Sequence, residues 1–208
     1  MLSIQKKFLF IHIPKTGGNS IQSILHKYSE DEIVVNPQFQ DGIDRFGVRN
    51  QVYNFSKHSP LIHYKERLPP DLYTGLFKFA CIRNPWEMMI SYYFSPHRNV
   101  QVWNRQDFIK MLQVAPTMAA FISLGISSQD QAPSLSKDID FLMRLETIDT
   151  DFKEVCRRLD IEPEPLPVRN KSTRQHYSVY YDDELIEMVA KKFYWEISFA
   201  GYQFGKDI

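Results

Sequence analysis

The chain has 208 residues, a length that suits one domain, so we expect residues 1–208 to share a single core. Hydrophobic residues make up 43% and charged residues 24% of the chain, which excludes an intrinsically disordered protein. Lysine plus arginine and aspartate plus glutamate both number 25, and this balance argues against a general nucleic-acid or anionic-membrane binder while leaving room for a local basic pocket.

The first predicted element is a strand over residues 8–13. This run is almost unbroken in its apolar character and rich in aromatic and β-branched residues, which is typical of a strand buried on both faces. Six apolar residues are far too few to cross a bilayer, and no small-residue cleavage site of a signal peptide follows them. We therefore expect no stable insertion into a membrane.

The loop after this strand, with the sequence PKTGGNS, carries the strongest functional pattern. Apolar residues recur at helical spacing over residues 21–28, so the loop joins a strand to a helix. Such a turn points backbone N–H groups and the positive end of the helix at one place, which suits an anion, and glycines allow close approach. The candidate anion-binding residues are Lys15, Thr16, Gly17, Gly18, Asn19 and Ser20. An ordinary turn with a solvated lysine is the alternative.

The next stretch is predicted to be less regular. The predicted elements are an irregular connection over residues 29–50 with a short strand at 33–36, a strand over 51–56, and a short helix over 62–68 that two prolines end. Residues 29–75 hold seven acidic residues against five lysines or arginines, which disfavours a densely anionic partner. His58 lies between the second strand and the helix, and the ordinary pKa of histidine suits a general base. A surface histidine beside Lys57 is the alternative.

A second buried strand is predicted over residues 76–82, and a helix begins at Pro85, which suits the first turn. Arg83 stands where open α/β sheets bind ligands, and its planar fork can hold a phosphate with two hydrogen bonds. Ser91 lies about two turns into the helix. The alternatives are a salt bridge to a nearby acid for Arg83 and a hydroxyl bonded to its own helix for Ser91.

The remaining elements follow the same alternation of strand and helix. We predict helices over residues 106–113, 117–124, 149–159 and 182–194, a strand over 141–145, and loops over 125–138 and 162–167. Asp182 or Asp183 is the expected cap of the last helix. The alternation predicts an α/β fold with a central parallel sheet and helices on both faces. Cys81 and Cys156 are expected to be reduced, buried thiols, which is typical of a cytoplasmic protein, and no Cys/His cluster suggests a metal.

Two of these motifs together resemble a known family. HIPKTGG-x-S resembles the 5'-phosphosulfate loop of sulfotransferases, the carbohydrate branch in particular, and Lys15 precedes both glycines instead of following them as in the ATP-type G-x-x-x-x-G-K-[ST] loop. CIRNPWEMMISYY resembles the family's 3'-phosphate motif, in which an arginine and a serine hold that phosphate; Met88 departs from it, because many relatives carry arginine there. The resemblance spans about residues 7–204 and barely covers 95–138.

Weaker similarities complete the comparison. His58 stands at a place comparable to the general base of bacterial and heparan-type relatives. The stretch RNKSTR resembles the C-terminal N-x-S loop that closes over the donor nucleotide, which implies Lys171 and Ser172 as donor contacts. A solvated basic loop is the alternative there. Arg144-Leu145-Glu146 and Gly201-Tyr202 resemble family segments that we interpret as scaffold and packing.

The resemblance implies a P-loop-like three-layer fold and a metal-free reaction. A sulfuryl group passes from 3'-phosphoadenosine 5'-phosphosulfate (PAPS) to a hydroxyl of an acceptor, expected to be a sugar, and leaves adenosine 3',5'-bisphosphate. Lys15 and His58 are the implied catalytic residues. A kinase that uses ATP and a non-catalytic nucleotide-binding protein are the alternatives. Eukaryotic relatives usually carry a membrane anchor before the catalytic domain. This sequence starts close to the first predicted strand, so we expect either a soluble cytoplasmic protein or a trimmed form of a membrane-anchored one.

Overall fold

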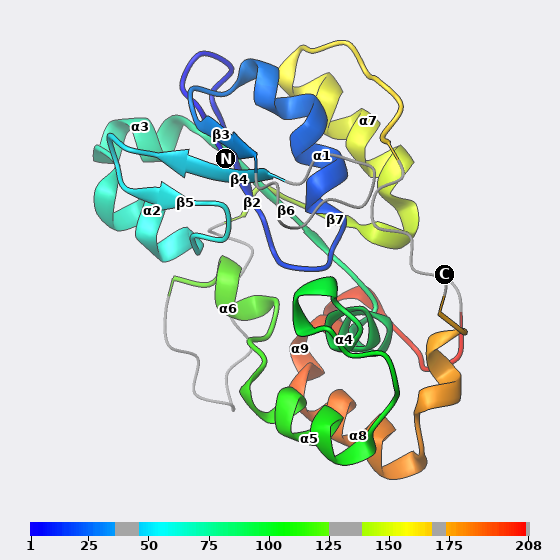
Figure 1. The fold of residues 1–208 in the computed structure, drawn as a ribbon. Coiled ribbons are helices and arrows are strands. Elements are labelled where there is room, and N and C mark those ends of the chain that lie inside the picture. The colour runs from blue at the N-terminus through cyan, green and yellow to red at the C-terminus, as the bar shows by residue number, and fades with distance from the viewer. Residues whose placement is uncertain (36–45, 125–138, 168–173, 207–208) are drawn as a thin grey trace.

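The computed structural model describes residues 1–35, 46–124, 139–167 and 174–206. A four-stranded sheet lies at its centre (Figure 1). Its strands, in spatial order, are β1 (Leu2–Ser3), β2 (Phe8–Ile11), β6 (Phe77–Ile82) and β7 (Phe141–Arg144). Strands β2, β6 and β7 are parallel, with Phe8 opposite Phe77 and Phe79 opposite Phe141. The predicted central parallel sheet is confirmed, and β1 adds a short antiparallel strand at its edge.

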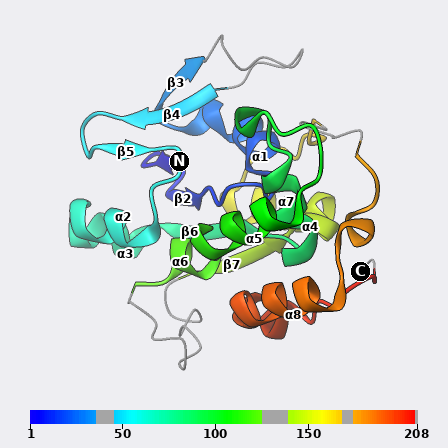
Figure 2. The same ribbon diagram turned by 60° about the horizontal axis from the view of Figure 1, so that its bottom comes forward.

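Helices cover both faces of this sheet, as Figures 1 and 2 show. On one side lie α1 (Gly18–Leu25) and α7 (Ile148–Leu159), and on the other α2 (Leu61–Arg67), α4 (Pro85–Tyr93), α5 (Arg105–Val114), α6 (Ala119–Ile122) and α8 (Asp183–Lys192). Because alternate side chains of a strand point to opposite faces, Phe10 and Met143 pack towards the first pair of helices, whereas Leu9 and Ile11 pack towards the larger group. The predicted three-layer α/β arrangement is confirmed.

A second, antiparallel sheet was not expected from the sequence. Its strands are β3 (Glu32–Val35), β4 (Phe46–Asn50) and β5 (Phe55–Ser56), paired in that order. The predicted irregular connection is therefore wrong over residues 46–50, which form β4, and the strand predicted over 51–56 is right only for its last two residues. The short strand predicted over 33–36 corresponds to β3, and residues 36–45 lie outside the described residues. These strands contain exposed polar residues such as Glu32, Arg49 and Ser56. Their structure therefore depends more on pairing with a neighbouring strand than on a pattern of buried apolar residues.

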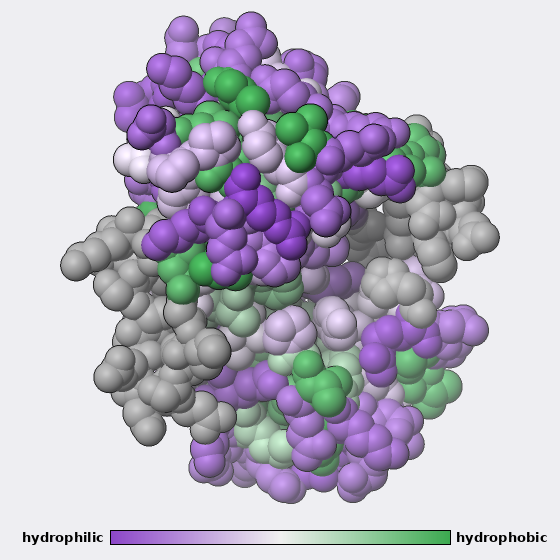
Figure 3. All heavy atoms as spheres, turned by 90° about the vertical axis from the view of Figure 1, so that its left-hand side faces the viewer, coloured by the Kyte–Doolittle hydropathy of each residue, from purple (hydrophilic) through white to green (hydrophobic). Residues whose placement is uncertain are grey.

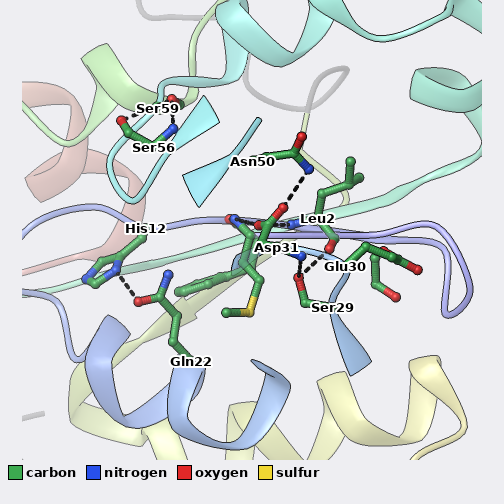
Figure 4. A network of polar contacts seen from close by, with 12 residues as sticks. Leu2, His12, Gln22, Ser29, Glu30, Asp31, Asn50, Ser56 and Ser59 are labelled. Carbon is green, nitrogen blue, oxygen red and sulfur yellow. Dashed lines mark hydrogen bonds and ion pairs between the residues drawn. The ribbon is translucent and has the colours of Figure 1, made fainter. Parts of the chain in front are cut away.

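A buried carboxylate ties the second sheet to the first (Figure 4). Asp31 Oδ2 accepts a hydrogen bond from the backbone N–H of Leu2 (2.9 Å), and Oδ1 accepts one from the Asn50 amide (2.8 Å). Beyond β5, Ser59 Oγ accepts from the backbone N–H of Ser56 (2.9 Å) and closes the turn that contains His58. The second sheet thus fixes the approach of this turn to the central sheet.

Most predicted helices match the structure closely. The predictions over 62–68, 106–113 and 149–159 correspond to α2, α5 and α7 within two residues. The helix predicted over 117–124 is shorter, because α6 holds only four residues. An additional helix, α3 (Pro70–Gly75), begins where two prolines suggested an end, since proline also suits the first position of a helix.

The helix predicted over residues 182–194 corresponds to α8 within two residues, and a further helix, α9 (Tyr194–Ala200), follows it. Asp182 caps α8, accepting from the backbone N–H of Leu185 (2.8 Å), as one of the two predicted caps. The fully buried side chain of Phe193 then separates α8 from α9. In the described ranges, no helix combines the length and the apolar character that a membrane span needs. On the face drawn in Figure 3, hydrophobic residues are scattered among hydrophilic ones.

Candidate functional site

The first half of the site is the loop between β2 and α1. Lys15 adopts a left-handed backbone conformation with φ of 70°, and Gly17 does the same with φ of 84°. The Gly17 carbonyl accepts from the backbone N–H groups of Ser20 (3.0 Å) and Ile21 (3.5 Å), which closes the first turn of α1. For glycine this conformation is easy, whereas for lysine it costs roughly 1–3 kcal/mol, and such strained residues cluster at functional sites.

Gly18, the first residue of α1, lies directly against the imidazole ring of His12. A Cβ atom at this position would lie 2.2 Å from Cδ2 of His12, so only glycine fits. His12 Nδ1 lies 2.9 Å from Gln22 Oε1, which pins the ring between strand and helix (Figure 4). Burial lowers the pKa of His12 well below its usual value, and the neighbouring His58 and Lys57 lower it further. His12 is therefore neutral at pH 7.

The second half of the site is the turn between β6 and α4. Asn84 caps α4 by accepting hydrogen bonds from backbone N–H groups of its first turn. Glu146 in turn accepts from the backbone N–H of Asn84 (2.6 Å) and from the hydroxyl of Tyr202 (3.0 Å). Glu146 and Tyr202, expected to be scaffold and packing, therefore clamp the turn that presents Arg83.

Arg83 contacts both halves. Its Nη1 donates to the Lys15 carbonyl (3.0 Å), while Nε and Nη2 contact the Glu87 carboxylate at 3.3 and 2.8 Å. The salt bridge left open as an alternative for Arg83 is thus present. Arg174 Nη2 lies 3.8 Å from the same carboxylate. Burial raises the pKa of Glu87, but the charges of Arg83 and Arg174 more than offset this, and the net pKa is lowered. Glu87 is therefore ionised at neutral pH.

The two halves line one pocket of about 600 Å³. It brings together seven residues predicted from sequence, namely Lys15, Gly17, Gly18, Asn19, Ser20, Arg83 and Ser91. Lys15 Nζ also donates to Ser95 Oγ (3.4 Å). Thr16 differs, because its buried hydroxyl donates to the Ile13 carbonyl (2.9 Å) and braces the loop from inside. Lys171 and Ser172 lie outside the described residues.

Several lining residues were missed from the sequence, among them His12, Glu87 and Asp149, whereas Arg174 ends the RNKSTR stretch that the resemblance placed over the donor. A signal for Glu87 exists, because Arg83, Glu87 and Ser91 are spaced by four, with Arg83 just before α4 and the other two on one face of the helix. No comparable spacing leads to Asp149, which comes from α7.

His58 does not line this pocket but adjoins it through His12. Its Nδ1 lies 2.9 Å from the His12 carbonyl, and the two rings meet edge to face with centroids 4.6 Å apart. A carbonyl can only accept, so Nδ1 of His58 carries the proton and Nε2 keeps its lone pair in the neutral ring. The His58 side chain is exposed.

Neither metal ligands nor disulfides mark the site. Across residues 1–35, 46–124, 139–167 and 174–206, no group of three or more His, Cys, Asp or Glu side chains could hold a metal ion. Cys81 and Cys156 are free and buried, as predicted, and burial raises the pKa of both thiols.

Comparison with known proteins gives one positive result. No curated protein matches the chain. A family model described as the sulfotransferase family matches residues 1–203 of the 208. The match covers both halves of the pocket, from the loop after β2 to the clamp residue Tyr202. The chain therefore belongs to the sulfotransferase family.

Proposed function

We propose that this sulfotransferase moves a sulfuryl group from PAPS to a hydroxyl group of a carbohydrate. Membership of the family supports sulfuryl transfer in general, and the donor and the acceptor are the proposed part. The observation that carries the proposal is that the loop at residues 15–20 lines the same pocket as Arg83, just before α4, and Ser91, on α4. PAPS bears phosphates on both the 5' and the 3' side of its ribose, so it requires two anion sites in one pocket.

The residues of the pocket fit this donor. A volume of about 600 Å³ lies within the usual range for small-molecule sites. The pocket is lined by Gly17, Gly18 and Asn19 at the start of α1, where backbone N–H groups favour an anion. Asn19 Oδ1 is buried and has no hydrogen-bond partner in the described part of the chain, so a ligand group that donates a hydrogen bond, such as a hydroxyl, can satisfy this oxygen.

Each residue then has a proposed role. Bound PAPS supplies the sulfuryl group, and negative charge develops on the oxygen that links it to the 5'-phosphate. The Lys15 ammonium neutralises this charge. The loop at residues 15–20 holds the 5'-phosphate, with Thr16 contributing through its backbone. Arg83 and Ser91 hold the 3'-phosphate, and Lys171 and Ser172 close over the nucleotide.

His58 is the proposed general base. Its Nδ1–H donates to the His12 carbonyl, so Nε2 can accept the proton of the acceptor hydroxyl. Its exposure lets an acceptor reach the ring from solvent. The buried, neutral His12 beside it adds no competing positive charge.

The acceptor and the location rest on fewer observations. The form of the first motif favours a carbohydrate, and the acidic excess of residues 29–75 favours a neutral glycan over a densely anionic one. A lipid-linked sugar or a small alcohol has the same reacting group. We propose the cytoplasm as the location, because both cysteines are free and reduced thiols persist there.

The decisive experiment is incubation of the protein with PAPS and a glycan array, read by mass spectrometry for added sulfate. Sulfate on a neutral glycan supports the proposal. Tighter binding of ATP than of adenosine 3',5'-bisphosphate would point to a kinase instead. Tight bisphosphate binding without transfer to any of a broad panel of acceptors would point to a non-catalytic nucleotide-binding protein.

Lys15→Ala tests the assigned chemistry. We expect transfer to be abolished while bisphosphate binding weakens only modestly, because the lysine acts on charge that develops during the reaction. Lys153, an exposed lysine on α7, is the control, and Lys153→Ala should leave both quantities unchanged. Near wild-type turnover of Lys15→Ala would remove Lys15 from the mechanism.

A further inference from the structure

The guanidinium of Arg83 forms hydrogen bonds along two of its edges. Glu87, in the first turn of α4 and four residues after Arg83, contacts Nε and Nη2 and so holds one edge of the guanidinium. On the other side, Nη1 donates to the Lys15 carbonyl at 3.0 Å. The Arg83 side chain is only 13% exposed, so these contacts are little screened by water. Arg83 is thus a rigid link between α4 and the loop after β2.

The loop needs such a link at this residue. Lys15 is held with φ of 70°, a conformation that a non-glycine residue keeps only when its surroundings enforce it. Thr16 braces the next residue from the protein interior. The hydrogen bond from Arg83 to the Lys15 carbonyl is a contact between the turn before α4 and the strained peptide itself. Where the Lys15 side chain enters the pocket therefore depends on where Arg83 is held.

We propose that Glu87 is a positioning residue for Lys15, acting through Arg83. The Glu87 carboxylate fixes the guanidinium, and the guanidinium fixes the lysine peptide from which the ammonium enters the pocket. The inference rests on the proposed function, because it assigns Lys15 to the reacting bond. Glu87 itself does not touch that bond, and its carboxylate is negatively charged, as is the donor.

This sign makes the proposal testable. A carboxylate beside a phosphate site weakens anion binding through Coulomb repulsion. The Glu87 carboxylate should therefore not increase the affinity for the nucleotide. If it positions Lys15, its contribution is to turnover. Loss of the Glu87 charge should therefore lower turnover without weakening nucleotide binding. A residue needed only for folding would lower both.

The experiment compares Glu87→Gln and Glu87→Asp with the wild type in the full chain. Gln keeps the length and removes the charge, while Asp keeps the charge and shortens the reach to Arg83. We expect turnover with PAPS to fall roughly 10- to 100-fold in both variants, the cost of a small misplacement of a reacting group. Calorimetry should find bisphosphate affinity unchanged in Glu87→Asp and unchanged or up to about tenfold tighter in Glu87→Gln.

Hydrogen exchange gives a readout that does not depend on activity. The amide hydrogens of Ser20 and Ile21 bind the Gly17 carbonyl and report whether the loop is closed. In both variants we expect them to exchange at least about threefold faster in the free protein. Glu154→Gln is the control, because Glu154 pairs with Arg157 and Arg158 on α7, outside the pocket. It should change neither exchange, affinity nor turnover.

The outcomes separate cleanly. Unchanged turnover, or unchanged exchange at Ser20 and Ile21, overturns the positioning role. A parallel loss of affinity, turnover and thermal stability in both variants also overturns it and leaves Glu87 as a folding residue. If the wild type itself shows no preference for the 3'-phosphate and no transfer, the proposed function fails instead, and the exchange result still decides whether Glu87 orders the loop.

Discussion

At the scale of single residues, Arg83 provides a direct test of the donor site, because it lines the pocket and contacts both of its halves. A charge-assisted contact to a phosphate contributes roughly 2–4 kcal/mol when two hydrogen bonds form. Arg83→Ala should therefore lower the affinity for the 3',5'-bisphosphate by that amount. Calorimetry should show that the variant binds the bisphosphate no better than the 5'-monophosphate.

A control arginine separates this effect from general loss of charge. Arg105 pairs with Asp182 and Glu184 at the surface, away from the pocket. Arg105→Ala should leave the preference for the bisphosphate intact. If the wild-type protein itself binds both nucleotides equally well, the 3'-phosphate site is not where we place it, and PAPS loses its main support.

His58→Ala tests the proposed base. Nucleotide binding should stay intact, since no phosphate contact is lost, while turnover should fall by roughly 10²–10⁴-fold, the usual span for removal of a general base. Wild-type activity should also fall on the acid side, as protonation occupies Nε2, and this limb should be missing from any residual activity of the variant. Steady-state rates measured across a pH series check both expectations.

His63 is the matched control for this experiment. It lies on α2, five residues further along, and His63→Ala should change little. The reverse result, with His63 essential and His58 silent, would mean that the base is misassigned while the donor site stands. If neither matters, an acid such as Glu66 or Asp71 becomes the next candidate.

The residues that sequence reasoning located are those that follow directly on a buried strand. Lys15 and Arg83 could be placed because parallel strands bring their carboxyl ends to one edge of the sheet. Glu87 was missed although its spacing from Arg83 gave a signal, whereas Asp149 was missed because it comes from α7, far in the sequence from both halves of the pocket. Thr16 shows the opposite limit: its type fits an anion site, but only the fold reveals that its hydroxyl points inward.

At the scale of elements, the contact between β2 and α1 sets how closely the loop can approach a ligand. In Gly18→Ala the added methyl group would meet the His12 ring, so helix and strand must separate. We expect a loss of roughly 1–3 kcal/mol in the free energy of unfolding, the usual cost of overpacking. Urea unfolding measures it.

Gly75 is the control for this substitution. It ends α3 with no atom within 4 Å of an added Cβ, and its φ is not positive. Gly75→Ala should therefore leave stability unchanged or raise it by about 0.4–1 kcal/mol, through the lower entropy of the unfolded chain. Equal losses of unfolding free energy in the two variants would mean that the contact between Gly18 and His12 does not contribute specifically to stability.

The elements that could be predicted are those with a strong pattern of apolar residues in the sequence. The three parallel strands and helices α2, α5 and α7 have long apolar runs or stripes, and the sequence located them. The antiparallel sheet has short, half-exposed strands, and hydrogen bonds such as those of Asp31 determine its place. The division between α8 and α9 depends on the burial of Phe193, a tertiary effect that helical spacing does not encode.

At the scale of the whole molecule, the pocket lies where the two helical layers diverge from the sheet. One wall comes from α1 and α7, which pack on one face, and the other from α4, which packs on the opposite face. A ligand that spans the pocket therefore contacts both layers. Binding of the bisphosphate should accordingly stabilise the protein against global unfolding.

His12 sits at this junction and couples global stability to pH. Its pKa is lowered in the folded protein, first by burial, whereas in the unfolded chain it is about 6.5. Below pH 6.5 the unfolded state therefore binds more protons than the folded one, and stability present above that pH is lost as the pH falls towards the folded pKa. The slope reaches at most about 1.4 kcal/mol per pH unit.

His12→Gln, which removes the titrating group, should flatten the dependence of unfolding free energy on pH between 6.5 and 4.5. Above pH 7.5 the difference between the two proteins should be constant, which serves as the internal control for urea titrations at each pH. An identical slope in wild type and variant would show that His12 is not the group that links folding to protons.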